Sequence, residues 1–253
     1  MYPSKIAEKA VESIHRFYDI PMDCDGTAES LRCDGEKYGV EHFVISSVAT
    51  APRQVESINA FIAKTVKESN GCMTGLGTLH PDSETIENDI RFIKESGLKG
   101  IKLHPDFQKF AVDSEKAFRI YELCKDELPV LMHTGDNRYD YSNAARVKNV
   151  LENFPGLTLI GAHLGGYSLW TEAWKTLCDY NNFYVDCSSS LFALSSQKAT
   201  EIINAYGSRR VLFGSDYPMW SYDRELERFF KLGLTESQKQ QILCENASEI
   251  FKI

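Results

Sequence analysis

Short apolar runs recur along the chain at nearly constant intervals, and this spacing limits the folds that the chain can adopt. The starts of successive runs lie 26 to 30 residues apart. Each run is nearly continuously apolar, which is typical of parallel strands that are covered on both faces. The runs are His42–Val48, Cys72–Leu79, Lys99–His104, Leu128–His133, Leu157–His163, Phe183–Cys187 and Arg210–Asp216.

The stretches between these runs have helical spacing. Ser114 is expected to cap one helix, and Gly97 to end another. Strands that alternate with helices predict parallel βα units, and a (β/α)8 barrel of about 250 residues has about 31 residues per unit. No Gly-, Ser- or Pro-rich linker divides the chain, so we expect a single TIM-type barrel domain over residues 1–253. The predicted helices are Gln54–Lys67, Ile86–Glu95, Ser114–Cys124, Ala144–Asn153 and Leu169–Asp179.

The runs number seven, whereas such a barrel has eight strands. The segment where the first strand belongs, residues 5–14, has one apolar helical face instead. Tyr2-Pro3-Ser4 resembles the loop and N-cap before a helix. We therefore expect the first strand to be missing or displaced, with its place upstream of Met1.

The composition excludes several classes of protein. The formal net charge is −8 and no run of lysine or arginine occurs, so the basic surface that nucleic-acid binding needs is absent. No stretch approaches the about 18 consecutive apolar residues of a membrane-spanning helix. Seven cysteines without a CxxC pair favour reduced thiols. We expect a cytoplasmic protein with a small-molecule substrate and no nucleic-acid or membrane partner.

Several predicted strands end in a side chain that can bind a metal ion or carry a proton. Four of the six histidines stand at such ends, and an aspartate ends the last strand. Residues at the carboxyl ends of barrel strands face the active site. Imidazole and carboxylate are the usual ligands of zinc and related divalent ions. The residues that draw attention to this end of the barrel are His80, His104, His133, His163 and Asp216.

Five motifs together resemble the amidohydrolase superfamily, in its amidohydrolase-related branch of metal-dependent hydrolases with a TIM-barrel fold. The resemblance covers the chain from residue 2 onward, and the motifs around His163 and Asp216 are the most specific. The motifs are Gly100-Ile-Lys-Leu-His-Pro105, Val130-Leu-Met-His-Thr-Gly135, Gly161-Ala-His-Leu-Gly-Gly166, Val211-Leu-Phe-Gly-Ser-Asp-Tyr-Pro218 and Ile242-Leu-Cys-Glu-Asn-Ala247.

This resemblance implies roles for three of the residues. His133, on the fifth strand, would be a metal ligand, and His163, on the sixth, would bind a second ion or contact the substrate. Asp216, on the eighth, would be both a ligand and the general base. The implied activity is metal-dependent hydrolysis of a C–N or C–O bond through metal-activated water, with zinc as the expected ion. Some similar proteins are non-oxidative decarboxylases, which is the alternative.

The chain departs from the family pattern at its start. The His-x-His pair that ends the first strand in the family is absent, and His15 lies in the predicted first helix. We therefore expect a chain that is short at its N-terminus. Such a chain would bind its ion weakly through His133 and Asp216, since three or more ligands are usual. A truncated, catalytically inactive barrel is a third hypothesis, and family habit together with an exposed barrel edge favours a homodimer.

Other residues near these motifs allow more than one interpretation. His80 and His104 each precede Pro-Asp, which a strand-to-helix turn explains equally well. Lys102 shares a strand face with His104 and could be a carbamylated metal bridge, a substrate anchor or part of an internal ion pair. Arg138 and Tyr141 follow the fifth strand, either as contacts to an acidic or aromatic substrate or in a solvated loop. We predict His104, Lys102, Arg138 and Tyr141 as substrate-binding residues.

Overall fold

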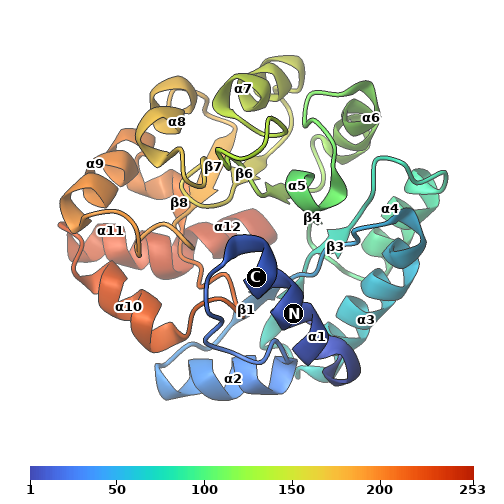
Figure 1. Ribbon diagram of the computed structural model, residues 1–253, viewed down its shortest axis with the longest axis horizontal. Helices are drawn as coiled ribbons and strands as arrows, with labels where there is room; N and C mark the ends of the chain where they lie inside the picture. Colours follow the sequence, from blue (N-terminus) through green and yellow to red (C-terminus); the bar gives the residue numbers. More distant parts are fainter.

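The central strands form the barrel that the sequence predicts. The computed structural model describes residues 1–253, with parallel strands at the centre and helices around them (Figure 1). Hydrogen-bonded neighbours follow the order of the chain, and every pairing is parallel. The strands are β1 (Phe43–Ile45), β2 (Met73–Gly75), β3 (Gly77–Thr78), β4 (Ile101–Leu103), β5 (Val130–Met132), β6 (Leu159–Gly161), β7 (Phe183–Asp186) and β8 (Val211–Leu212).

Each of the seven apolar runs contains a strand, which confirms the predicted fold class. The run Cys72–Leu79 forms both β2 and β3, and only Leu76 separates these two strands. Strands β1 and β2 pair with each other, and β3 to β8 form a second sheet.

Helices connect the strands, and α4 and α7 have the predicted bounds. Ser114 caps α6 as predicted, and Gly97, with a φ of +75°, follows α4. The prediction that Ser4 caps the first helix is wrong, because extended Pro3 holds the cap position and Ser4 begins the helix. None of these helices has the length and apolar character needed to cross a membrane. The helices are α1 (Ser4–Tyr18), α2 (Ala28–Lys37), α3 (Val55–Glu68), α4 (Ile86–Glu95), α5 (Pro105–Gln108), α6 (Glu115–Cys124), α7 (Ala144–Asn153), α8 (Trp170–Leu177), α9 (Ser196–Tyr206), α10 (Tyr222–Phe230), α11 (Glu236–Gln240) and α12 (Asn246–Phe251).

Alternate residues of each strand face opposite sides of the sheet. In β4 the two residues that flank Lys102 are fully buried in the main core, whereas Lys102 lines a cavity inside the barrel. The strand pairings place Leu131, Ile160 and Tyr184 in the same row as Lys102. These three side chains pack together in the barrel interior. An ammonium group thus lies beside an apolar floor.

Helices α1 and α12 both overlap the middle of the ring in Figure 1 and lie at opposite ends of the barrel. Tyr18, the last residue of α1, lies against His104 and His133, which follow the carboxyl ends of β4 and β5. Phe251 of α12 packs against Leu76 and Ile160 inside the barrel. Helix α1 therefore covers the mouth of the barrel, and α12 closes its floor.

The strands do not form a closed ring, because β1 and β8 are not paired with each other. Helical segments near the C-terminus meet the edge of β8 instead: the Phe213 amide donates to the Ile242 carbonyl, and the Asn246 side chain donates to Val211. Val44, in the middle of β1, is 37% exposed. A cavity of about 550 Å³ inside the barrel reaches this seam between β1 and β8.

Candidate active site

Three histidines meet at the mouth of the barrel. His104 and His133 directly follow β4 and β5, and His163 lies two residues beyond β6. All three are buried. Because the carboxyl ends of parallel strands lie on the same side, their rings come into contact. The rings of His104 and His133 stack at 4.1 Å, and Nε2 of His163 lies 3.1 Å from Nδ1 of His133.

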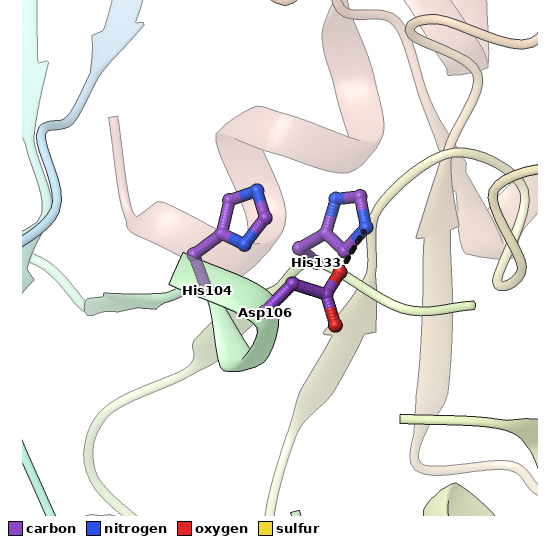
Figure 2. A group of neighbouring side chains, drawn as sticks. All are labelled: His104, Asp106 and His133. Atoms are coloured by element: carbon purple, nitrogen blue, oxygen red, sulfur yellow. Dashed lines mark ion pairs between the residues drawn. The ribbon is translucent and has the colours of Figure 1, made fainter. Parts of the chain in front are cut away.

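A buried carboxylate completes this group. The single turn of α5 brings Asp106 back toward β5, so that its Oδ2 lies 3.1 Å from Nε2 of His133 (Figure 2). The two side chains are 0% and 1% exposed. Neither oxygen of Asp106 nor Nε2 of His133 has a hydrogen bond of good geometry. Buried polar atoms without a partner are rare in proteins, and here they face one another.

The hydrogen bonds of His163 determine which nitrogen of His133 is free. Nδ1 of His163 lies 3.0 Å from the Ser188 carbonyl, which can only accept a hydrogen bond, so this nitrogen carries the proton. Nε2 of His163 then accepts the proton of His133 Nδ1. The lone pair of His133 Nε2 is left pointing toward Asp106. This is the usual arrangement for a histidine that binds a metal ion through one nitrogen while a second interaction orients the other.

Burial controls the protonation of the group. It lowers the pKa of His133 and of His104 well below the usual range, and neighbouring cationic groups, Lys102 among them, lower both further. Burial, with a smaller contribution from Asp136, raises the pKa of Asp106 to about 7. The imidazoles are therefore neutral, which is the form that binds metal ions.

His104, Asp106 and His133 together fit a divalent cation. One ligand atom from each lies within 4.8 Å of the others. Two imidazoles and a carboxylate are an ordinary donor set for zinc and for similar ions. Both oxygens of Asp106 and Nε2 of His133 are buried without a hydrogen-bond partner. A purely structural ion pair would not leave these atoms unsatisfied, whereas a bound cation would satisfy them. The sequence predicted His133 and His104 for the site but missed Asp106, because His104-Pro-Asp106 also matches a turn motif.

Asp216 lies on a different side of the site. Its Oδ2 accepts a hydrogen bond from the Ser189 hydroxyl at 2.6 Å, and that hydroxyl accepts one from the Trp220 indole at 3.0 Å. Asp216 lines the interior cavity together with Lys102, His163 and Asp186. The carboxylate beside His133 is Asp106, so the pairing of His133 with Asp216 as metal ligands stays a prediction.

Aromatic side chains cover the histidines from above. The Tyr18 hydroxyl lies 2.9 Å from Nε2 of His104, and its ring packs against Tyr167. Phe107 stacks on His104 with ring centroids 4.0 Å apart. Burial raises the pKa of Tyr18 well above the usual value, so the phenol is protonated. Tyr18 was not predicted, since helical periodicity does not reveal that α1 ends over the barrel.

The loop after β5 places its predicted residues elsewhere. The guanidinium of Arg138 makes two hydrogen bonds to Asp136, at 2.9 and 2.6 Å, and one to the Phe17 carbonyl at 2.6 Å. Arg138 therefore already has an anionic partner and ties α1 to the barrel. Tyr141 stacks on Tyr139, with ring centroids 6.0 Å apart, and does not line the interior cavity.

His80 lies in a turn after β3, where its Nδ1 accepts a hydrogen bond from the Asp82 amide at 3.2 Å. Asp82 does not cap the next helix, because Thr85 holds the cap position of α4. His80 is buried but lies outside the group formed by His104, Asp106 and His133.

Solved structures share this architecture. An uncharacterised TIM-barrel protein from Bordetella bronchiseptica has a TM-score of 0.79 at 20% identity, with 99% of this chain and 95% of that chain covered. The 5-carboxyvanillate decarboxylase of Sphingomonas paucimobilis gives 0.73 at 17%, with 88% and 82% covered. A dihydroxybenzoic acid decarboxylase from Polaromonas sp. JS666, with bound manganese and the inhibitor 2-nitroresorcinol, gives 0.70 at 19%, with 89% and 86% covered.

Comparisons of the sequence also find a decarboxylase and the Amidohydrolase family. A gamma-resorcylate decarboxylase from Polaromonas sp. is 26% identical over 123 residues, which cover 41% of this chain and 37% of the relative. The match thus spans little more than a third of that relative. Residues 7–253 match the Amidohydrolase family. On this match, and with the barrel described above, the chain belongs to the amidohydrolase family, whose members are enzymes.

Proposed function

We propose that the protein is a divalent-metal-dependent decarboxylase that releases CO2 from a small aromatic acid without an oxidant. The observation that carries this proposal is the buried His104–Asp106–His133 group beside a cavity lined by Lys102, His163 and Asp216. The relatives with a named activity support decarboxylation over the hydrolysis expected from the sequence.

His104, Asp106 and His133 would hold the ion. When bound, a divalent ion supplies positive charge that stabilises electron density on an oxygen of the substrate. Zinc and manganese both suit this donor set. With three ligands in place of two, we expect stoichiometric binding, where the sequence alone predicts weak binding.

The reaction itself needs one proton. The bond between the ring carbon and the carboxylate breaks, CO2 leaves, and the electron pair stays on the ring carbon. That carbon takes a proton from Asp216 in its carboxylic acid form, and solvent returns a proton to Asp216 after the product leaves. We assign this role to Asp216 because its carboxyl lines the cavity and the Ser189 hydroxyl fixes its orientation. His163 lines the same cavity, and its hydrogen bonds to His133 and Ser188 would hold His133 in position beside the substrate.

Hydrolysis is the second candidate, because the family as a whole is named for it. In that reaction Asp216 would take a proton from an attacking water, and His163 would hold His133 in position through their hydrogen bond. The same residues serve both reactions, so the products decide between them. Release of CO2 from 2,6-dihydroxybenzoate supports decarboxylation, whereas cleavage of an amide or lactone without CO2 supports hydrolysis.

Asp216→Asn should lower the rate of CO2 release from 2,6-dihydroxybenzoate by about 100-fold or more, because the amide cannot supply the proton. The measurement uses protein loaded with manganese or with zinc. His80→Gln is the control, since His80 lies in a turn outside the site, and it should stay within about threefold of the wild-type rate. A similar rate for Asp216→Asn and wild type contradicts the role of Asp216. Release of CO2 from no aromatic acid contradicts the proposed function.

A further inference from the structure

Lys102 is a cation without a partner inside the barrel. Its side chain projects from the middle of β4 into the interior cavity, beside Leu131 on the neighbouring strand. The ammonium has neither a hydrogen bond nor an ion pair in the structure, and it lines the cavity. An ammonium surrounded by protein without an anion is unfavourable, so the position suits a ligand that brings the negative charge.

Besides the exposed Glu41, two carboxylates line this cavity, and each is already hydrogen-bonded to other groups. Oδ1 of Asp186 accepts hydrogen bonds from the Ser188 amide and hydroxyl and from the His163 amide. Asp216 accepts from Ser189. Neither carboxylate forms an ion pair with Lys102. Lys102 therefore stays available to an anion that enters the cavity.

The depth of Lys102 distinguishes its role from that of the metal-binding group. Lys102 precedes His104 by two residues on the same strand, which places its Cα about 7 Å closer to the floor of the barrel at about 3.3 Å per residue. A substrate held through a ring oxygen by an ion at His104, Asp106 and His133 would extend its opposite end down toward Lys102. His163, which contacts His133, lines the cavity together with Lys102. The cavity, of about 550 Å³ and reaching the seam between β1 and β8, can hold one aromatic ring with its substituents.

The chemistry of decarboxylation also assigns Lys102 to an anion other than the leaving carboxylate. An ammonium paired with the leaving carboxylate would stabilise the substrate more than the transition state, in which that charge moves into the ring, and would slow the reaction. An ammonium paired with a group that keeps its charge has no such effect. Such an ammonium fixes the position of the substrate in the cavity and favours substrates that carry this second charged group.

We propose that Lys102 binds a second acidic group of the substrate, so that the site selects small aromatic acids with two anionic groups. The inference rests on the proposed decarboxylase function and names its substrate class. Lys102 is in this view a specificity residue that contacts the substrate away from the reacting bond.

The test compares two probes, isophthalate with two carboxylates and benzoate with one. Equilibrium binding to the manganese-loaded protein is measured by titration calorimetry for wild type, Lys102→Met, Lys102→Arg and Lys99→Met. We expect wild type to bind isophthalate about tenfold or more tightly than benzoate, the size of one charge-assisted contact. Lys102→Met should bind the two equally. Lys102→Arg should keep part of the preference, and Lys99→Met, which removes an exposed charge three residues away, should keep all of it.

Two results would overturn the inference. One is a wild type without preference for isophthalate. The other is a Lys102→Met variant in which both probes weaken by the same factor, which would mean that Lys102 only shapes the cavity. Thermal unfolding guards against a folding defect, because removal of an unpaired buried charge should not lower Tm. Wild-type protein that binds as expected but releases no CO2 from any acid would contradict the decarboxylase function and leave the assignment of Lys102 intact.

Discussion

Asp106→Asn is expected to abolish metal binding and activity while it stabilises the metal-free protein at alkaline pH. Burial raises the pKa of Asp106 from 3.8 to about 7 in the folded protein. The unfolded chain loses this proton near pH 4, whereas the folded protein keeps it until about pH 7. Wild-type stability therefore falls across this window relative to the Asn variant, which never has to be charged. The gain above pH 7 should be on the order of 4 kcal/mol.

Elemental analysis of the metal and urea unfolding with a chelator at pH 5 and pH 8 measure the two effects. Asp82→Asn is a matched control, because His80-Pro81-Asp82 repeats the motif of His104-Pro105-Asp106. Asp82 is 54% exposed in its side chain, and a hydrogen bond from Lys116 lowers its pKa. This control should keep the metal and gain no stability at pH 8. Full metal content in Asp106→Asn would rule out Asp106 as a ligand.

Gly135→Ala is expected to have the largest effect on folding. Gly135 has a φ of +92°, and a Cβ there would lie 2.5 Å from the Tyr167 amide nitrogen and 2.6 Å from the Gly166 carbonyl carbon. These are backbone atoms in the loop that carries His163, so they cannot move aside without disturbing the site. The strained φ and the backbone clash together should cost about 3 to 5 kcal/mol of unfolding free energy.

Gly207→Ala separates the two contributions. Gly207 has a similar φ of +83°, but no atom lies within 4 Å of the position of its Cβ. Only the conformational strain of φ +83° and ψ +132° remains there, about 2 kcal/mol. Urea unfolding of both variants gives the comparison. Equal losses would show that the loop containing Gly166 and Tyr167 moves aside at little cost.

The fold was largely predictable because its strands are covered on both faces. Such strands are continuous apolar runs, and the runs lie one βα unit apart, so seven strands and most of the helices between them follow from local patterns. Helices α2, α5, α9, α10, α11 and α12 were not predicted. In α2 the polar residues leave little periodicity for a pattern to detect, and α5 and α11 are only four and five residues long.

The candidate site was predictable only in part. His104, His133 and His163 follow strands directly, so the strand prediction also places them together. Asp106 joins them because one turn of helix reverses its direction, and short turns have no periodic signal. Arg138 was predicted as a substrate contact, but its partner Asp136 lies only two residues away, and such local pairing depends on loop conformation. Sequence patterns give the positions along the strands, whereas the loops decide which side chains meet.

The closure of the barrel floor by α12 has a consequence for synthesis. Leu76 comes from the first third of the chain and Phe251 from its last helix, yet they pack together inside the barrel. Contacts between residues so distant in sequence form slowly, because a long loop must close first. When translation has completed the last strand, at Leu212, Phe251 of the barrel floor has not yet been synthesised. Assembly of this interior therefore has to wait until translation has passed residue 251, and the nascent barrel keeps an open, apolar end until then.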